Sequence, residues 1–420
     1  MATELQTSST RTRPRHPPLV LRVLAIPGFA RLLASQALFD IGAVARTAAQ
    51  SWVMYDLTGS NLWVGIVSGM RSVPILILPI FAGAIADRFD KRKLLGVVRV
   101  ALAIVSIVQA ILIALDIIEP WHMLVLALAA GTVVSFAMPA FWAYIADIVA
   151  PRALPRATAL IMMGENAGEM VGPVIVGWII ATAGADWAYG IIAAIYLAGA
   201  IFILNAPKGR YATSVTETED KPTYYESVKQ GIAYARKSPT LPWLFIMNAS
   251  VNITGVAIFP LMPEYATKIL DVGAVGFGVM STALGVGLAV GSLIIAITGM
   301  PRRVIWIIIV SSFIWDFGMI GFGFSRIYPL TLILLFIMGI AGMFWVNAII
   351  NLFQREAIGE MRGRVMSLYT IGMGLFPLGW TFGGTLSHLI GNELTLIISA
   401  LGGTPLILIA MLLSPGLRRS

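Results

Sequence analysis

The sequence contains no cysteine, only three histidines and few charged residues, and each scarcity excludes a kind of chemistry. Without cysteine the chain cannot form disulfides, thiolate nucleophiles or cysteine-ligated metal sites. The histidines, His16, His122 and His388, lie far apart and form no HExxH pair, so we expect no metal site and no cofactor. The sequence also lacks a GxxxxGK[ST] loop for nucleotides, and its apolar segments hold no Ser/His/Asp set. We therefore expect a protein that is not an enzyme and that draws on an ion gradient for any uphill transport.

Charged residues make up only 12% of the chain, whereas hydrophobic residues make up 58% and the mean hydropathy is +0.86. A soluble globular protein is usually about 45–50% apolar and about 25% charged. So few charges cannot cover a soluble protein of 420 residues, and lipid must therefore surround most of the chain. The formal net charge of +8 does not indicate a nucleic-acid partner, because the basic residues lie in short loops between apolar segments.

The apolar residues fall into long runs, and a helix that crosses a bilayer needs about 20 of them. We predict an all-α membrane protein with twelve transmembrane helices, at residues 29–57, 62–86, 94–115, 122–147, 157–183, 187–205, 241–263, 273–298, 304–324, 329–353, 363–389 and 394–414. The even-numbered loops between these helices are basic, whereas the odd-numbered loops are poor in Lys and Arg. This bias predicts that both termini are cytoplasmic, in the inner or plasma membrane of a prokaryote.

A long polar segment divides the predicted helices into two groups of six. The expected organisation is a cytoplasmic tail (1–28), a six-helix bundle (29–205), a cytoplasmic linker (206–240), a second six-helix bundle (241–414) and a cytoplasmic tail (415–420). Residues 154–160 resemble residues 362–368, and Gly83 and Gly291 lie at the same spacing. Two halves related by a repeat are a known transporter architecture, with the substrate site between them. We expect a monomer, because each chain would hold both halves of its own site.

The loop after the second predicted helix carries the most specific motif. Residues 83–93, GAIADRFDKRK, resemble the G-x-x-x-D-R-x-G-[RK]-[RK] loop of the major facilitator superfamily, with Asp90 where a glycine is usual. Residues 147–157 and 362–369 are similar to the helix 4–5 connection and the R-G-R-V-x-S segment of the enterobactin-exporter-like and macrolide-efflux-like branch. The resemblance covers about residues 29–413. It implies the major facilitator fold, and a branch whose members export siderophores, macrolides or unknown compounds.

The same resemblance implies that these loops form a cytoplasmic gate and not the substrate site. The residues that it assigns to the gate are Gly83, Asp87, Arg88, Lys91, Arg92, Asp147, Arg152, Arg156, Arg362 and Arg364. Physically, Gly83 would let two helix backbones approach closely. Asp87 would meet the positive N-terminus of a neighbouring helix.

The fifth predicted helix contains the stretch GEMVGPVIVG at residues 168–177, which resembles the G-x-x-x-G-P-x-x-x-G element associated with exporters and proton antiporters. Gly168 and Gly172 form a face of small residues, and Pro173 allows a kink before Gly177. The element is therefore a candidate hinge, although ordinary tight helix packing would produce the same pattern.

Ionisable residues within the predicted helices are the candidates for proton coupling and for a central cavity, because a charge inside the membrane is costly and usually faces a cavity or a partner. These residues are Asp40, Arg46, Arg71, Glu165, Glu169 and Asp316. Glu165 and Glu169 are four residues apart and share a helix face, where burial and mutual repulsion favour a proton on at least one of them. The alternative is that some of the six form structural ion pairs.

Four tryptophans in the predicted helices are candidates for lining the same cavity. They are Trp52, Trp142, Trp345 and Trp380, and they would suit a bulky amphipathic substrate. The alternative for each of them is a position that faces lipid or the membrane interface.

Together these features predict a secondary transporter. The leading hypothesis is a proton-coupled exporter of an amphipathic small molecule, drug-like or siderophore-like, whose partners are that molecule, protons and the lipid bilayer. An importer or facilitator of a small nutrient or organic anion is the alternative, and Arg46 and Arg71 would then bind the anion. A non-transporting sensor is less favoured, because the longest loop, 206–240, is short for a sensory domain.

Overall fold

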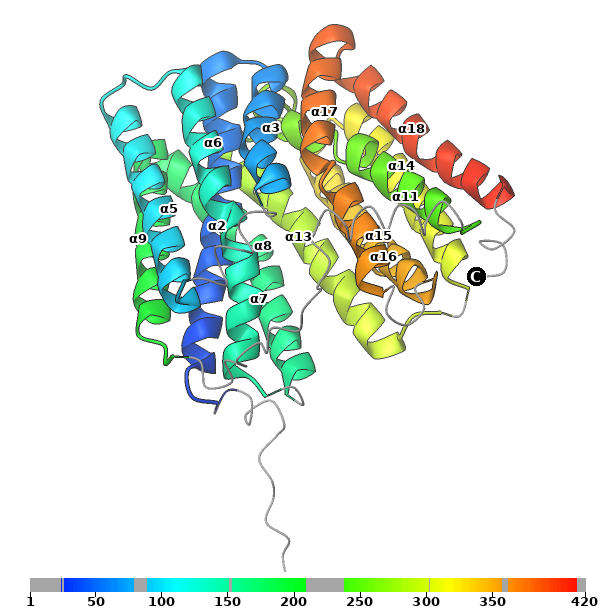
Figure 1. The fold of residues 1–420 in the computed structure, drawn as a ribbon. Coiled ribbons are helices and arrows are strands. Elements are labelled where there is room, and N and C mark those ends of the chain that lie inside the picture. Colours follow the sequence, from blue (N-terminus) through cyan, green and yellow to red (C-terminus); the bar gives the residue numbers. More distant parts are fainter. Residues whose placement is uncertain are drawn as a thin grey trace, which may run out of the picture.

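The computed structural model describes residues 24, 26–78, 89–150, 153–208, 238–301, 303–356 and 362–413, and within these ranges the regular structure is helical. Figure 1 shows the helices in two groups that lie next to each other. We call α2 to α9 the N-terminal group and α11 to α18 the C-terminal group. The gate residues Gly83, Asp87, Arg88 and Arg152 lie outside the described residues.

The N-terminal group consists of α2 (Phe29–Thr58), α3 (Asn61–Ile77), α5 (Lys91–Ala114), α6 (Pro120–Ser135), α7 (Ala137–Ile148), α8 (Leu154–Ala183) and α9 (Ala185–Leu204). The single helix predicted at 122–147 is divided into α6 and α7 at Phe136. Pro139 follows three residues later and has no N–H to donate to the preceding turn, which explains the interruption.

The C-terminal group begins with an irregular segment that contains α11 (Leu241–Ser250), η1 (Val251–Gly255), η2 (Phe259–Leu261), α12 (Met262–Glu264) and η3 (Tyr265–Ile269). The segment includes Pro260 and Pro263, which cannot donate the backbone hydrogen bonds of a regular helix. The other helices of the group are α13 (Gly273–Thr298), α14 (Val304–Phe324), α15 (Tyr328–Glu356), α16 (Arg362–Met373), α17 (Phe376–Ile390) and α18 (Asn392–Leu413).

Within the described ranges, nine helical spans are long and apolar enough to cross a membrane: Lys91–Ala114, Pro120–Ile148, Arg156–Ala183, Ala185–Leu204, Leu241–Ile269, Gly273–Thr298, Val304–Phe324, Tyr328–Glu356 and Asn392–Leu413. The helix α2 is 30 residues long but is not among them. Its buried residues include Gln36, Arg46 and Gln50, so its polar side chains point at other helices. Hydropathy alone therefore underrates a helix whose neighbours, and not lipid, surround it.

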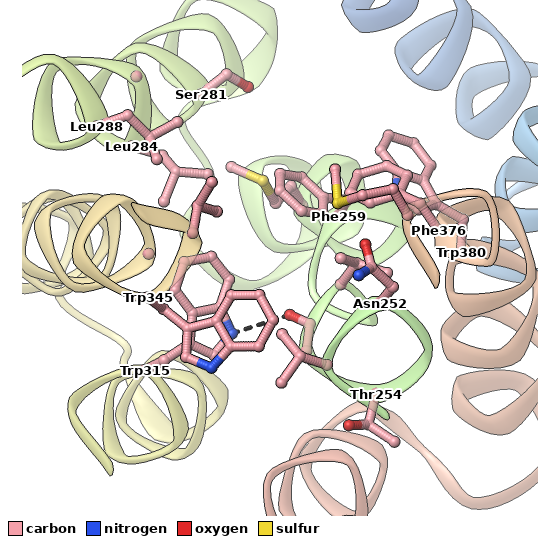
Figure 2. Close-up of a pocket in the computed structure, with 18 of the residues that line it drawn as sticks. Asn252, Thr254, Phe259, Ser281, Leu284, Leu288, Trp315, Trp345, Phe376 and Trp380 are labelled. Carbon is pink, nitrogen blue, oxygen red and sulfur yellow. Dashed lines mark hydrogen bonds between the residues drawn. The ribbon is translucent and has the colours of Figure 1, made fainter. Parts of the chain in front are cut away.

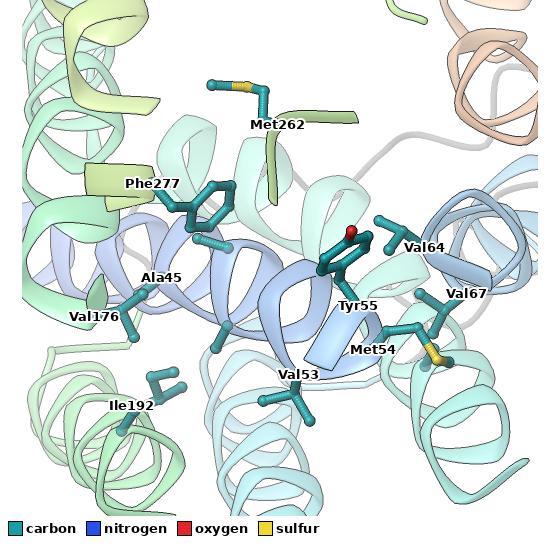
Figure 3. Packing of buried hydrophobic residues seen from close by; sticks show 14 of the residues in the cluster. Ala45, Val53, Met54, Tyr55, Val64, Val67, Val176, Ile192, Met262 and Phe277 are labelled. Atoms are coloured by element: carbon teal, nitrogen blue, oxygen red, sulfur yellow. The ribbon is translucent and has the colours of Figure 1, made fainter. Parts of the chain in front are cut away.

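Helix α2 packs at the centre of the apolar core. Figure 3 shows Val53, Met54 and Tyr55 of α2 beside Val64 and Val67 of α3. The same buried cluster includes Ile192 of α9 and Phe277 of α13, and it therefore reaches from one group into the other. Lipid tails are as apolar as these side chains, so close packing, more than the hydrophobic effect, holds such helices together.

Candidate functional site

A cavity of about 570 Å³ lies where the two groups meet. Residues of α2, α3 and α8 form one side. Residues of the C-terminal group form the other, and they come from η1, η2, α12 and each helix from α13 to α18. Small-molecule sites usually measure about 300–1,000 Å³. The cavity is thus large enough for a drug-sized molecule and draws on both groups, as a transporter site between two halves requires.

Aromatic side chains stand on two opposite parts of the cavity wall, as Figure 2 shows. On one part, Phe259 and Trp380 stack with ring centroids 5.3 Å apart and planes 6° apart, and Phe376 lies 6.0 Å from each. On the other part stand Trp315 and Trp345. The indole of Trp315 donates a 2.9 Å hydrogen bond to the carbonyl oxygen of Gly255. These flat surfaces suit a ligand with rings of its own.

Two of the four tryptophans proposed from the sequence, Trp345 and Trp380, line the cavity, and the other two do not. Trp52 lies beside it and packs against Phe277 with ring centroids 5.7 Å apart. Trp142 is 42% exposed and contacts Phe141 in an edge-on arrangement. The side chain of Trp142 therefore lies on the outer surface of the helices.

Arg71 of α3 brings a positive charge to the cavity wall. Its Nη1 donates a hydrogen bond to the Thr47 hydroxyl of α2, and its Nε has no partner among the described residues. Arg46 of α2 does not line the cavity, is only 1% exposed and donates a 3.2 Å hydrogen bond to Gln50. The two guanidinium groups are close enough to interact electrostatically. Among the described residues, no carboxylate lies within ion-pair distance of either one.

Asp316 of α14 brings a carboxylate to the opposite side of the cavity. It accepts a hydrogen bond from the Thr404 hydroxyl of α18, and no basic side chain of the described residues lies within ion-pair distance. A carboxylate without a cation in apolar surroundings can exchange a proton as its surroundings change. Asp316 therefore lies where a proton and a substrate could influence each other.

Asp40 lies inside the N-terminal group and is not part of the cavity wall. It accepts a 2.9 Å hydrogen bond from Gln36 and interacts electrostatically with Arg99 of α5. Arg99 is 1% exposed, donates to the Gln36 side chain at 3.3 Å and stands over the Phe39 ring at 5.3 Å. Our sequence analysis missed Arg99, although it lies within a predicted helix and the rule applied to the other buried charges would have found it.

The two glutamates of α8 are not brought to the cavity wall. Glu165 is partly buried and does not line the cavity. Glu169 lies in α8, but its side chain is outside the described part of the structure. Proton exchange at either residue stays a prediction.

The candidate hinge on α8 packs against two different helices. A Cβ atom at Gly168 would lie 3.0 Å from the Ile41 nitrogen of α2, and one at Gly172 would lie 3.1 Å from the Ile41 carbonyl oxygen. By contrast, Gly177 faces α13, where a Cβ atom would lie 2.5 Å from the Ala274 carbonyl oxygen. Helix α8 thus packs against α2 through Gly168 and Gly172 and against α13 across the seam through Gly177, and the Thr282 hydroxyl of α13 also donates a 2.9 Å hydrogen bond to the Met170 carbonyl.

A polar cluster joins the two groups at the end of the molecule where α3 begins and α17 ends. The Asn61 amide of α3 donates to Glu264 of α12, to the Ser387 hydroxyl at 2.9 Å and to Asn392 at 3.1 Å. Asn392 also donates to Glu264 at 2.9 Å. We call these four residues the Asn61 cluster. The sequence analysis did not find it, because Glu264 follows directly after the predicted end of its helix.

The Asn61 cluster extends to a cation and an aromatic ring. Lys268 lies 3.6 Å from Glu264 and 5.4 Å from the centre of the Tyr55 ring of α2. Nearby, the Thr381 hydroxyl of α17 donates a 3.2 Å hydrogen bond to the Gly65 carbonyl of α3. In Figure 1, α3 and α17 lie side by side at the top. These contacts close the cavity at this end.

Part of the proposed gate is visible at the opposite ends of the N-terminal helices. Lys91 at the start of α5 forms a 2.7 Å ion pair with Asp147 at the end of α7. Arg92 donates a 2.9 Å hydrogen bond to the Ala206 carbonyl beyond α9. Asp90, which replaces the usual glycine of the motif, caps α5 by accepting from the backbone nitrogens of Arg92 and Lys93.

The basic residues of the other gate segments are not seen in contact with this group. Arg156 is exposed at the start of α8. Arg362 and Arg364 begin α16, but their side chains are outside the described part of the structure. A contact between these residues and the Lys91–Asp147 pair stays a prediction.

The sequence matches the transmembrane secretion effector family over residues 20–417, which is nearly the whole chain. The chain belongs to this family. It is therefore a transporter of the major facilitator superfamily and not an enzyme, as the motifs predicted.

Curated relatives of this secretion effector include siderophore transporters. It is 24% identical to the staphyloferrin A transporter of Staphylococcus aureus (strain NCTC 8325 / PS 47), a match that covers 78% of this chain and 82% of that relative. It is 25% identical to the enterobactin exporter EntS of Shigella flexneri, with 85% of this chain and 80% of that relative covered. These relatives confirm the enterobactin-exporter-like branch that was predicted.

A solved structure supports the fold alone. A bacterial homologue of the human lysosomal transporter Spinster, in an inward-facing and occupied conformation, superimposes on this secretion effector with a TM-score of 0.71. The two chains are 14% identical, and the superposition covers 93% of this chain and 96% of the other. The arrangement of helices is therefore that of a major facilitator transporter.

Proposed function

We propose that this secretion effector is a proton-coupled exporter of an amphipathic small molecule. The observation that supports this most is the cavity between the two groups, because it combines aromatic faces, the Arg71 cation and the lone Asp316 carboxylate. The enterobactin exporters among its relatives favour outward transport. The substrate would be drug-like or siderophore-like.

The proposed topology has twelve membrane crossings and cytoplasmic termini in the cell membrane. The nine apolar spans of the described residues supply most of the crossings, and α2, α3, and α16 with α17 supply the others. The basic loops lie at the ends of the helices opposite the Asn61 cluster, so the positive-inside rule puts that cluster on the outer face. The structure would then represent a state that is closed to the outside.

The proposed mechanism is alternating access. In this mechanism the two groups rock against each other, so that contacts such as the Asn61 cluster open while contacts at the basic ends close. The glycines along the α8–α13 seam have no side chains, so the two helix backbones can touch there. Helices in contact through glycines can separate without disengaging interlocked bulky side chains.

Proton coupling is assigned to Asp316, with Asp40, Glu165 and Glu169 as further candidates. Protonation of Asp316 would remove a negative charge from the cavity wall, so the proton and the substrate would each change the affinity of the cavity for the other. Only a ligand or proton that interacts differently with the two conformations can drive the change between them. Asp316 is the leading candidate because its carboxylate lies in the cavity wall, where it accepts a hydrogen bond from Thr404.

The test is transport by purified protein in liposomes with an imposed pH gradient. With a bound compound identified by a thermal-shift screen, wild-type protein should move the compound only while the gradient lasts. Asp316→Asn should abolish the response to the gradient, and Asp271→Asn, an exposed carboxylate outside the cavity, should not. Unchanged gradient-driven transport in Asp316→Asn, Asp40→Asn and Glu169→Gln would rule out the proton assignment.

A further inference from the structure

The cavity holds more hydrogen-bond donors than the protein satisfies. The indole nitrogens of Trp345 and Trp380 have no partner among the described residues, although both side chains are more than nine-tenths buried and line the cavity. The Nε of Arg71 is also without a partner. Each unsatisfied buried donor carries a desolvation cost until water or a ligand provides an acceptor. A ligand that displaces water from this cavity must therefore bring acceptors of its own.

The charges around the cavity are unequal on its two sides. The N-terminal side has Arg71 at the surface and Arg46 behind it, and the described residues place no carboxylate within ion-pair distance of either. The titratable groups of α9 that interact with Arg46 are Tyr189 and Tyr196, and an uncharged phenol does not neutralise a guanidinium. Asp40 of the same group does not line the cavity, and it interacts electrostatically with Arg99.

On the C-terminal side, Asp316 is the one carboxylate that the described residues contribute to the cavity wall. Its side chain already accepts a hydrogen bond from Thr404. The two arginines therefore outweigh the single acid. Unused donors lie on both sides of the cavity, Arg71 on the N-terminal side and Trp345 and Trp380 on the C-terminal side. A guanidinium with free N–H groups binds a carboxylate more strongly and more directionally than a neutral acceptor.

We propose that the substrate is an anionic aromatic molecule rich in oxygen acceptors, whose acidic end binds Arg71 while its rings stack on the Phe259–Trp380 pair. This inference rests on the proposed function, because it assigns a substrate class to the same cavity. Trp380 contributes a ring face and an N–H, and Trp345 contributes an N–H on the opposite part of the wall. The geometry disfavours an organic cation, which would bring further donors and a like charge to Arg71 and Arg46.

The test compares three probes that share one naphthalene ring: 2-naphthoate, its methyl ester and 2-naphthyltrimethylammonium. Dissociation constants are measured by the quenching of tryptophan fluorescence in the purified full chain in lipid nanodiscs at one pH and salt concentration. We expect 2-naphthoate to bind about tenfold more tightly than the ester, and the ester more tightly than the cation. Equal binding of the three, tighter binding of the cation, or no binding of any probe up to its solubility limit would overturn the inference.

Substitutions at Arg71 and Trp380 test whether these residues cause the preference for 2-naphthoate. Arg71→Gln should reduce the preference for 2-naphthoate over the ester to about twofold or less, whereas Arg71→Lys should keep most of it. Arg326→Gln is the control, because Arg326 is paired with Glu393 outside the cavity. Trp380→Phe keeps the ring and removes the N–H, so it should weaken binding of the ester and of 2-naphthoate but not that of the cation. A preference that persists in Arg71→Gln would place the anion elsewhere and would overturn the assignment.

The binding test and the transport test can fail separately. If 2-naphthoate binds with the expected Arg71 dependence but no pH gradient drives any compound across liposomes, the inference stands and the proposed function fails. If the cation binds best while Asp316-dependent transport is observed, the proposed function stands and the inference fails.

Discussion

The two groups of helices differ in the kinds of polar side chain that they bury. The N-terminal group buries two cations, Arg46 and Arg99, together with the amides of Gln36 and Gln50. Among the described residues, the buried polar side chains of the C-terminal group are serines, threonines and asparagines, and the charge of Asp316 is only partly buried at the cavity. Both groups adopt long helices in lipid, so the difference concerns their interiors and not their surroundings.

This difference indicates a division of tasks. A fixed cation in a low-dielectric interior keeps its charge and creates a lasting field, because arginine does not release its proton in proteins. A carboxylate beside a hydroxyl can change its charge. The N-terminal group thus supplies the constant positive side of the cavity, and the C-terminal group supplies the aromatic surface and the group that can titrate.

The strongest challenge to this comparison is the removal of a buried charge from the N-terminal group. Arg99→Met would leave Asp40 and Gln36 without their buried partner and should lower the free energy of unfolding by about 3–5 kcal/mol. The measurement is reversible unfolding in mixed lipid and detergent micelles. The control is Ser399→Ala in the C-terminal group, whose buried hydroxyl has no partner among the described residues and should cost less than about 1 kcal/mol. Similar losses in the two variants would contradict the comparison.

A smaller effect is expected at the seam between the groups. A Cβ atom at Gly278 of α13 would lie 2.5 Å from the Pro173 carbonyl oxygen and 3.3 Å from the Gly177 Cα of α8. Gly278→Leu should force the helices apart, at a cost of about 1–3 kcal/mol.

Spin labels on cysteines introduced at the exposed positions Trp187 and Ile327 would report this separation as a longer distance. Gly190→Leu on α9 is the matched control, because a Cβ atom there meets nothing within 4 Å. An unchanged distance in Gly278→Leu would show that the seam tolerates side chains and that the backbones need not touch.

The Asn61 cluster should contribute about 1 kcal/mol, because it is only partly buried. Glu264→Gln keeps the shape of the side chain but removes the charge that accepts from Asn61 and Asn392 and faces Lys268. The variant should increase the open fraction in the same spin-label measurement about fivefold. Lys268→Met should have a smaller effect, since Lys268 is exposed. A larger effect from Lys268→Met would assign the closure to the ion pair instead of the amide network.

The smallest difference is expected at the cap of α5, which distinguishes this chain from the usual motif. Asp90→Ala removes the side-chain acceptor for the nitrogens of Arg92 and Lys93 and should cost about 1 kcal/mol. Asp90→Gly restores the residue usual in the motif and should cost only a few tenths of a kcal/mol. The same unfolding measurement checks both variants. If Asp90→Gly were the more damaging, the aspartate would have a role beyond capping.

The sequence predicted where the helices lie more accurately than it predicted which way their residues face. The long apolar runs are enough to find the spans, but they do not show orientation, because a helix in lipid is apolar on its inner and outer sides alike. Trp142 and Trp345 therefore looked equivalent, yet the first is exposed and the second lines the cavity.

Charged residues within the predicted helices indicated the cavity wall better than aromatic residues did. Arg71 and Asp316 were selected because they interrupt apolar runs, and both line the cavity. The same reasoning did not separate them from Arg46 and Asp40, which lie inside the N-terminal group. The distinction depends on helix rotation and on partners distant in sequence, such as Arg99, and these are set by tertiary packing.

The polar interior of α2 has a consequence for how the chain enters the membrane. Helix α2 is not among the spans that are apolar enough to cross a membrane by composition, and its residues Gln36, Asp40 and Arg46 would be costly to expose to acyl chains. In the folded protein, its polar side chains form hydrogen bonds with α5 and with other residues of α2. The helices α8 and α9 pack against its surface. The end of α9 at Leu204 lies 146 residues beyond the end of α2 at Thr58, so the helices that shield the polar residues of α2 from lipid are translated well after it.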